Sequence, residues 1–345
     1  MAKIKIAMIA PLAISIPPKK YGGSEFVIHY LTEGLVEKGY DVDLYATGDS
    51  ITKANLIPMS KQGQWELAGN QDPDLGPYHL NMIFEVIEAA SNYDIIHDHL
   101  GPLGVLLARE CKTPVISTQH IPITEMRAKL FNKYRDNYNI ISISNNQRKN
   151  YPDLNYAATV YNGIPVEDYT YNPSNENYLC FLGRFDKKKG AIEAIEVAKT
   201  TGNRLIMAAR IEDISYYHKY IKPEIDGKKI IYIGEVNFKQ KVKLLRNAKA
   251  LLSLIQWEEP FGLVVPEANA CGTPVIVNPR GAFPELVKNG INGFLTDNTI
   301  ENAAKLVRRI SEIDRSKCRK HVEEHFSVDI MIENYIEVYK KILAK

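Results

Sequence analysis

The chain has 345 residues, of which 45% are hydrophobic and 24% are charged, and its formal net charge at pH 7 is +2. This composition is typical of a globular protein and excludes a disordered or fibrous chain. The charge is too small to favour nucleic-acid binding, and no arginine-rich patch with interleaved aromatic residues is present. A chain of this length is expected to form two domains.

The cysteines are scattered without a CxxC pair, which indicates structural thiols and neither a metal site nor a redox disulfide. The N-terminal apolar run is short and broken by prolines, so it fits a first buried strand better than a signal peptide. No stretch reaches the roughly eighteen apolar residues that a membrane span needs. The sequence therefore predicts a cytoplasmic protein.

Short apolar runs alternate with amphipathic helical stretches along the chain, which is typical of βαβ units with parallel sheets. The first helix is expected to run from Ser24, a capping residue, to a stop at Gly39. Strands of the first half are predicted at about 4–10, 42–46, 94–97, 114–118, 139–143 and 158–161.

A pair of glycines, Gly22 and Gly23, lies between the first predicted strand and the first helix. Glycine lets the backbone approach a ligand closely, and the start of a helix offers unpaired N–H groups to an anion. A plain turn is the alternative interpretation.

The third predicted strand ends in His97, Asp98 and His99. A His-x-His pair is compatible with metal binding, but no third ligand with suitable spacing follows, so a metal site is not favoured. Two interpretations stay open: a histidine pair satisfied within the fold, or one imidazole that lines a ligand site.

The second half repeats the pattern of the first. After an expected linker at 162–177, rich in Asn, Pro and Tyr, new strands are predicted at 177–185, 204–210, 229–235, 250–256 and 273–278. Two successive doubly wound units imply an α/β protein with two Rossmann-like domains that face one another across a cleft. A last amphipathic helix, from about Val328 to Leu343, could pack on either domain.

Open parallel sheets bind ligands beyond the carboxyl ends of their strands. At the end of the first strand of the second half, Arg184, a forked donor, and Lys189, a point charge, flank the turn. Together these cations suit a diphosphate. The alternative is that Lys187, Lys188 and Lys189 form a solvated surface run.

Glu259 follows the predicted strand at 250–256, and Glu267 lies in the first turns of the helix after it. Carboxylates are good acceptors for sugar hydroxyls. Two such acceptors beside a helix N-terminus fit a nucleotide sugar, which has two polyhydroxyl parts joined by a diphosphate. The alternative is a pair of exposed charges.

Several segments, taken in order, resemble the retaining glycosyltransferases of the GT-B fold, in the large family with the Glu-x7-Glu motif (glycosyl transferases group 1, family 4). The resemblance spans nearly the whole chain. It implies two facing Rossmann-like domains, at 1–165 with the final helix 328–345 crossing back, and at 166–327. The segments are YGGSE (21–25), HDH (97–99), YNGIP (161–165), GRFDKKKG (183–190), EPFGLVVPEANACGTPVIV (259–277) and GAFPELVKNGINGFL (281–295).

The resemblance also implies roles for individual residues. Arg184 and Lys189 match the basic pair that binds the donor diphosphate, and Glu259 and Glu267 match the glutamates for the donor sugar and the ribose. His99 matches the histidine beside the transferred sugar, with His97 as the alternative. The remaining donor-binding positions that it implies are Gly22, Gly23, Phe261, Gly262, Leu263 and Val264.

The implied reaction moves a hexose from a UDP- or GDP-linked donor to a hydroxyl of a small-molecule, glycan or lipid acceptor, with retention at the anomeric carbon. The alternatives are a sugar-nucleotide 2-epimerase, a glycan phosphorylase or a catalytically silent nucleotide-sugar-binding subunit. The nucleotide sugar is a co-substrate, and no cofactor is expected. No metal is expected either. Asp72 and Asp74 form an Asp-x-Asp pattern that resembles a metal-binding motif, but it lies in a Gly- and Pro-rich loop without strand context and is interpreted as a turn.

Acceptor choice is expected to lie in first-domain loops such as 50–80 and 120–135. The segment 120–135 contains basic residues such as Arg127 and Lys133. Peripheral contact of these residues with anionic lipid is one interpretation, and a solvated helix face is the favoured one. No oligomeric state is predicted.

Overall fold

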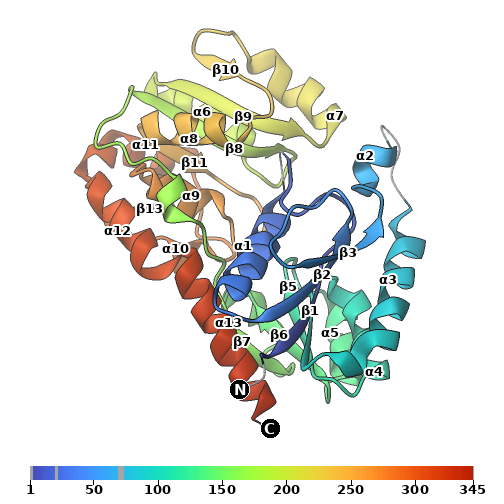
Figure 1. Cartoon of the computed structure of the whole chain (residues 1–345). Coiled ribbons are helices and arrows are strands. Elements are labelled where there is room, and N and C mark those ends of the chain that lie inside the picture. Colours follow the sequence, from blue (N-terminus) through green and yellow to red (C-terminus); the bar gives the residue numbers. More distant parts are fainter. Residues whose placement is uncertain (1–2, 20–21, 69–73, 345) are drawn as a thin grey trace. The chain divides into compact units, whose positions relative to one another are not determined.

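The computed structural model describes residues 3–19, 22–68 and 74–344. The chain divides into two compact units (Figure 1). Unit 1 comprises Met1–Gly163 and Val328–Lys345, and unit 2 comprises Ile164–Ser327. The chain thus leaves unit 1 within the stretch expected to be the linker.

Unit 1 is built on a parallel sheet in the order β3-β2-β1-β4-β5-β6-β7. Its strands are β1 (Lys5–Ile9), β2 (Asp41–Thr47), β3 (Asn55–Ser60), β4 (Ile95–Asp98), β5 (Val115–Gln119), β6 (Tyr138–Ser142) and β7 (Tyr156–Thr159). Its helices are α1 (Gly23–Glu37), α2 (Gln64–Ala68), α3 (Leu75–Ala89), α4 (Val105–Glu110), α5 (Glu125–Lys133) and α13 (Val328–Leu343).

The two regions expected to be loops for acceptor choice contain regular structure. Residues 50–80 include β3, α2 and the start of α3, and residues 120–135 include α5. The expectation of plain loops was therefore wrong. β3 is an edge strand whose residues are all at least partly exposed, and Pro58 interrupts its short apolar run, which argues against a buried strand when only the sequence is known.

The C-terminal helix α13 packs on α1 in unit 1. Gly34 permits the close approach, because a Cβ at this position would lie 2.0 Å from Cδ1 of Ile332. Two buried tyrosines of α13 also reach the sheet. The Tyr339 hydroxyl lies 2.7 Å from Nδ1 of His97 and the Tyr335 hydroxyl 3.0 Å from Oγ1 of Thr118, so the helix is fixed by polar contacts as well as by packing.

Unit 2 is built on a parallel sheet in the order β10-β9-β8-β11-β12-β13. Its strands are β8 (Tyr178–Phe185), β9 (Arg204–Ile211), β10 (Ile230–Tyr232), β11 (Ala250–Ser253), β12 (Val275–Val277) and β13 (Gly293–Leu295). Its helices are α6 (Ala191–Thr201), α7 (Ile214–Tyr216), α8 (Phe238–Asn247), α9 (Val264–Ala270), α10 (Phe283–Leu286), α11 (Ile300–Arg309) and α12 (Arg315–His325).

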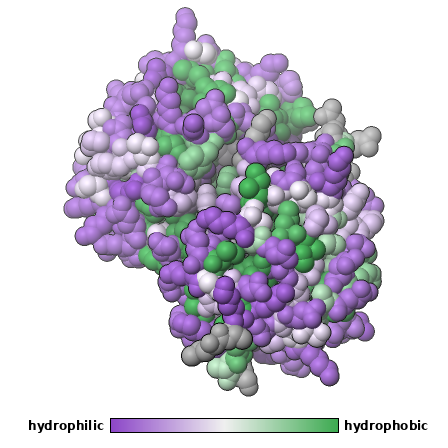
Figure 2. All heavy atoms as spheres, viewed as in Figure 1, coloured by the Kyte–Doolittle hydropathy of each residue, from purple (hydrophilic) through white to green (hydrophobic). Residues whose placement is uncertain are grey.

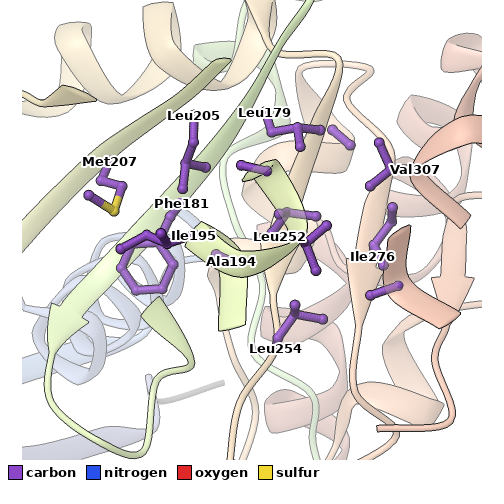
Figure 3. Packing of buried hydrophobic residues seen from close by; sticks show 14 of the residues in the cluster. Leu179, Phe181, Ala194, Ile195, Leu205, Met207, Leu252, Leu254, Ile276 and Val307 are labelled. Carbon is purple, nitrogen blue, oxygen red and sulfur yellow. The ribbon is translucent and has the colours of Figure 1, made fainter. Parts of the chain in front are cut away.

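One core cluster of unit 2 lies between its sheet and the helices α6 and α11 (Figure 3). Helix α6 presents Ala194, Ile195 and Ala198 at helical spacing, and all three are fully buried. They meet apolar side chains of the strands, such as Leu252 and Leu205. Each large aliphatic side chain buried in this way contributes roughly 1.5–3 kcal/mol to folding.

In both units the first strand is followed on one side by the next two strands and on the other by the fourth. This is the strand order of the Rossmann fold. The strands stay parallel, but the order in which they are added across the sheet reverses between the first and fourth strands. Ligands of such sheets bind at that point, beyond the carboxyl ends of the strands. The relevant loops therefore follow β1 and β4 in unit 1, and β8 and β11 in unit 2.

The face drawn in Figure 2 is mostly hydrophilic, with hydrophobic residues in separate groups. Across residues 3–19, 22–68 and 74–344, the structure has no helix that is both long and apolar enough to cross a membrane.

Candidate active site

The two loops after β8 and β11 are in contact in unit 2. Gly190 ends the first loop with φ +74, and a Cβ here would lie 2.0 Å from the backbone oxygen of Leu254. The Gln256 amide also donates to the carbonyl of Lys188 at 2.8 Å. Only glycine allows this approach, which brings Lys189 next to the loop that carries Glu259.

Lys189 and Glu259 form a largely buried ion pair. Nζ of Lys189 lies 2.6 Å from Oε2 of Glu259, and the two side chains are 16% and 13% exposed. The indole Nε1 of Trp257 donates to the same oxygen at 2.9 Å. The ammonium of Lys189 also lies 5.1 Å from the centre of the Trp257 ring, so one tryptophan contacts both members of the pair.

Arg184 lies near the end of β8 and binds a different set of carboxylates. Nη1 is 3.3 Å from Oε1 of Glu212, and Nη2 is 3.5 Å from Oδ2 of Asp186. Its Nε is buried and has no hydrogen-bond partner within the described residues. The structure thus places Arg184 and Lys189 on one strand-loop segment, each paired with its own acids.

The backbone around Glu259 is held by a second loop. The Ala282 amide donates to the carbonyl of Glu259 at 2.9 Å, and the Gly281 amide donates to Oε2 of Glu258 at 2.8 Å. Gly281 has φ +57, and a Cβ there would lie 2.2 Å from the carbonyl oxygen of Glu259. This contact requires glycine and fixes the path of the Glu259 loop.

Phe261, Gly262, Leu263 and Val264 form the entry to helix α9. Phe261 is buried, Gly262 has φ +92, Leu263 is the capping residue and Val264 is the first helical residue. The first amide groups of a helix usually have no intrahelical partner. Here the Val265 amide donates to the carbonyl of Gly262 at 3.0 Å, and Pro266 has no N–H. The N–H donors that this segment can present to a ligand are therefore those up to Val264.

Glu267 lies in the first turn of α9 and is 8% exposed. Its Oε1 accepts hydrogen bonds from Nζ of Lys241 at 2.5 Å and from the hydroxyl of Tyr169 at 3.0 Å. Glu267 is therefore a buried carboxylate with two hydrogen-bond donors, and the alternative of an exposed helical charge is wrong.

The two histidines after β4 in unit 1 differ in their surroundings. His97 is fully buried, and its ring nitrogens contact the hydroxyls of Tyr339 and Thr118. His99 is 5% exposed, with Nδ1 2.8 Å from Nε2 of His120 and Nε2 3.2 Å from the sulfur of Met8. Both imidazoles thus have protein partners at both ring nitrogens, and His99 differs in that its partners are a second histidine and a sulfur.

Burial shifts the pKa values in this cluster. It lowers the pKa of His97 to about 3 and that of His120 to about 4. The pKa of His99 is also well below its ordinary value, because of burial first and the neighbouring histidines second. Burial raises the pKa of Asp98 to about 7. The imidazoles are accordingly neutral at pH 7.

The glycine pair of unit 1 lies at the start of α1. A Cβ at Gly22 would lie 2.7 Å from Cδ1 of Ile14, so packing as well as ligand approach explains a glycine here. Gly23 is the first helical residue.

Asp72, of the Asp-x-Asp pattern, lies outside the described residues. Asp74 caps α3 and accepts from the Gly76 amide at 3.2 Å. Across the described part of the chain, no group of three or more His, Cys, Asp or Glu side chains could hold a metal ion.

Sequence reasoning missed three residues that contact the glutamates. Trp257 lies two positions before Glu259 and could have been found from its place in the same loop. Lys241 and Tyr169 lie 26 and 98 positions from Glu267, and no local pattern connects them to it.

Comparison with known proteins shows the family of the chain. The family model described as "Glycosyltransferase Family 4" matches residues 21–168, and the model "Glycosyl transferases group 1" matches residues 170–325. The chain is 24% identical to the uncharacterized glycosyltransferase MJ1607 of Methanocaldococcus jannaschii, with 98% of each chain covered.

Two solved structures illustrate the similarity of fold. The first is AviGT4, a glycosyltransferase involved in avilamycin A biosynthesis, with a TM-score of 0.77, 24% identity, and coverage of 99% of this chain and 98% of that one. The second is Alr3699/HepE of Anabaena in complex with UDP-glucose, with a TM-score of 0.74, 18% identity, and coverage of 98% and 100%.

Proposed function

Because the chain belongs to the group 1 glycosyltransferases, which act on nucleotide sugars, we propose that it transfers a hexose from a UDP- or GDP-linked donor to a hydroxyl acceptor. The proposal includes retention of configuration at the anomeric carbon and independence from metal ions. A small molecule, a glycan or a lipid would serve as the acceptor.

The ion pair of Lys189 and Glu259 is the observation that carries the proposal. Its members stand on the loops after the first and fourth strands of a Rossmann sheet, where ligands of such sheets bind. A donor diphosphate would compete with Glu259 for the ammonium of Lys189. The carboxylate released in this way would accept hydrogen bonds from hydroxyls of the donor sugar.

In the proposed reaction the bond between the anomeric carbon and the phosphate oxygen breaks, and the acceptor oxygen forms a bond to that carbon on the same face. Negative charge develops on the diphosphate, where Lys189, Arg184 and the amides at the start of α9 would stabilise it. The acceptor proton would pass to the leaving phosphate oxygen. Removal of one such preorganised donor typically raises a barrier by about 3–4 kcal/mol.

Glu259 would then position the sugar, with its Oε2 still held by the Trp257 indole, and the proposal gives it no role as a nucleophile or a base. His99 would contribute a neutral imidazole, since its lowered pKa keeps it uncharged near pH 7. A neutral imidazole donates or accepts a hydrogen bond without adding a charge.

The experiment is incubation with UDP-glucose and, separately, GDP-mannose, with and without a panel of hydroxyl acceptors, followed by NMR of the products. We expect slow release of free nucleotide diphosphate without acceptor, faster release with a suitable one, and a product with the anomeric configuration of the donor. An inverted product would contradict the proposed mechanism. A sugar altered while still attached to the nucleotide would indicate an epimerase, and binding without turnover would indicate a silent subunit.

A further inference from the structure

The carboxylate of Glu267 is held through only one of its two oxygens. Oε1 accepts from both Nζ of Lys241, at 2.5 Å, and the hydroxyl of Tyr169, at 3.0 Å. No hydrogen bond to Oε2 occurs within the described part of the chain. The carboxylate is therefore fixed in orientation while one oxygen is left for a donor from outside.

Lys241 is itself fixed by its surroundings. It lies in the first turns of α8, which begins after a capping box formed by Asn237 and Gln240. Its ammonium lies 5.2 Å from the ring centre of Phe238 and 5.6 Å from that of Tyr169. The side chain is 15% exposed, so these contacts and the ion pair operate away from bulk water, where they are stronger.

Tyr169 is also held in place. Its side chain packs against Phe238 with ring centres 5.2 Å apart, and its carbonyl accepts from Nη1 of Arg319 at 2.5 Å. The same nitrogen of Arg319 donates a hydrogen bond to the carbonyl of Ala270, the last residue of α9. The tyrosine hydroxyl is thus positioned relative to the helix that carries Glu267.

The ammonium of Lys241 also balances the charge of Glu267. A buried carboxylate without a counter-ion would repel a nearby diphosphate, and it would be costly to bury. With Lys241 in place, Glu267 offers an acceptor oxygen to a hydroxyl with little net negative charge.

From this geometry we propose that Lys241 and Tyr169 are positioning residues that hold Glu267 as the acceptor for the ribose hydroxyls of the donor nucleotide. This inference rests on the proposed function, in which Glu267 binds the ribose. Neither residue touches the reacting atoms, and both act through the glutamate.

The test compares ribose-containing ligands with ligands that lack the ribose hydroxyls. Binding of UDP and GDP, and of their dideoxy forms without either hydroxyl, is measured by calorimetry for the wild type and for Lys241→Met, which keeps an apolar stem against the two rings. Lys243→Met is the matched control, because Lys243 is an exposed lysine two positions along the same helix. Tyr169→Phe removes a single oxygen and serves if the methionine variant does not fold.

We expect Lys241→Met to weaken binding of the ribose diphosphate about tenfold, the loss typical of one hydrogen bond to a charged group. Its effect on the dideoxy form should be clearly smaller, because only the repulsion between the uncompensated Glu267 and the diphosphate then remains and no hydroxyl contact is lost. Tyr169→Phe should show the same selectivity, and Lys243→Met should leave both affinities unchanged.

Equal losses for the ribose and dideoxy ligands would overturn the inference, because they would show that Lys241 and Tyr169 act only on the stability of the fold or on the phosphates. If the wild type bound neither diphosphate, the proposed function itself would be contradicted. The two failures are therefore distinguishable.

Discussion

Lys189 and Glu259 contact each other through Nζ and Oε2, 2.6 Å apart, although 70 positions separate them in the chain. The pair joins the residue proposed for the diphosphate to the residue proposed for the donor sugar. Each is the other's partner in the protein, so a donor that binds both would have to replace their mutual contact with two of its own.

Lys189→Ala is expected to lower kcat on the order of a hundred- to a thousandfold, because it removes the ammonium that would stabilise the leaving diphosphate. Turnover is measured as release of the nucleotide diphosphate. Lys187→Ala, at an exposed lysine of the same loop, is the control and should keep normal turnover. Near-normal turnover in the Lys189 variant would remove it from the site.

Glu259→Gln should abolish transfer while leaving the fold intact. The amide oxygen of glutamine can still accept from the Trp257 indole, but it no longer offers a charged acceptor to sugar hydroxyls or a counter-ion to Lys189. Transfer and the melting temperature are measured on the same sample. A folded variant that turns over normally would contradict the role assigned to Glu259.

Trp257→Phe keeps an aromatic ring beside Lys189 and removes the N–H that donates to Glu259. We expect kcat/KM for the donor to fall about tenfold, as for loss of one hydrogen bond to a charged group. The donor KM and kcat are determined separately by initial rates. Unchanged values of both would show that the indole does not orient Glu259.

Gly281→Ala should misplace the Glu259 loop, since the added methyl group would lie 2.2 Å from the Glu259 carbonyl oxygen. A shift of about 1 Å in a positioning group can cost on the order of a hundredfold in rate. Gly290→Ala is the control: its φ is also positive, at +80, but no atom lies within 4 Å of the added carbon. Equal activity in the two variants would argue against a steric role for Gly281.

The stability of the Asp98→Asn variant relative to the wild type should increase as the pH rises. The pKa of Asp98 is raised to about 7, above its ordinary value of 3.8. Between these values the folded wild type holds a proton that the unfolded chain has lost, so the contribution of Asp98 to stability falls as pH rises through this range. Asparagine does not titrate.

The melting temperature of the Asp98→Asn variant relative to wild type should therefore be higher at pH 8 than at pH 5. Groups such as His97 and His120 are common to both proteins, so their titration largely cancels in the difference. A difference that does not vary with pH would contradict the raised pKa of Asp98.

Chelation with EDTA should leave transfer unchanged if the diphosphate is neutralised by Lys189 and Arg184. Activity is compared before and after chelation, and again after addition of Mg²⁺ or Mn²⁺. Complete loss in EDTA with recovery on addition of metal would favour a metal-dependent reaction and renew interest in Asp72 and Asp74.

The strand and loop positions of the proposed site could be predicted from the sequence. The apolar runs at 177–185 and 250–256 fix where β8 and β11 lie, and residues just after such strands must reach the binding edge of the sheet. This reasoning placed Lys189 and Glu259 in the loops where the structure has them.

The partners of the site residues could not be predicted in the same way. Glu267 meets Lys241 and Tyr169 only because α8, α9 and the segment after Asp168 pack together, and that packing is set by the tertiary fold. His99 meets His120 for a similar reason, since β4 and β5 are neighbours in the sheet. Side-chain pairing across elements has no signature in local sequence.

The most direct test of the central claim is the melting temperature of the chain in the presence of UDP, GDP, ADP and their hexose conjugates, for the wild type and for Lys189→Ala. A ligand that binds only the folded state raises the melting temperature. We predict a clear rise with the diphosphates of one base in the wild type, and a much smaller rise in the variant. No rise with any ligand, or an equal rise in both proteins, would contradict a nucleotide-sugar site built on Lys189.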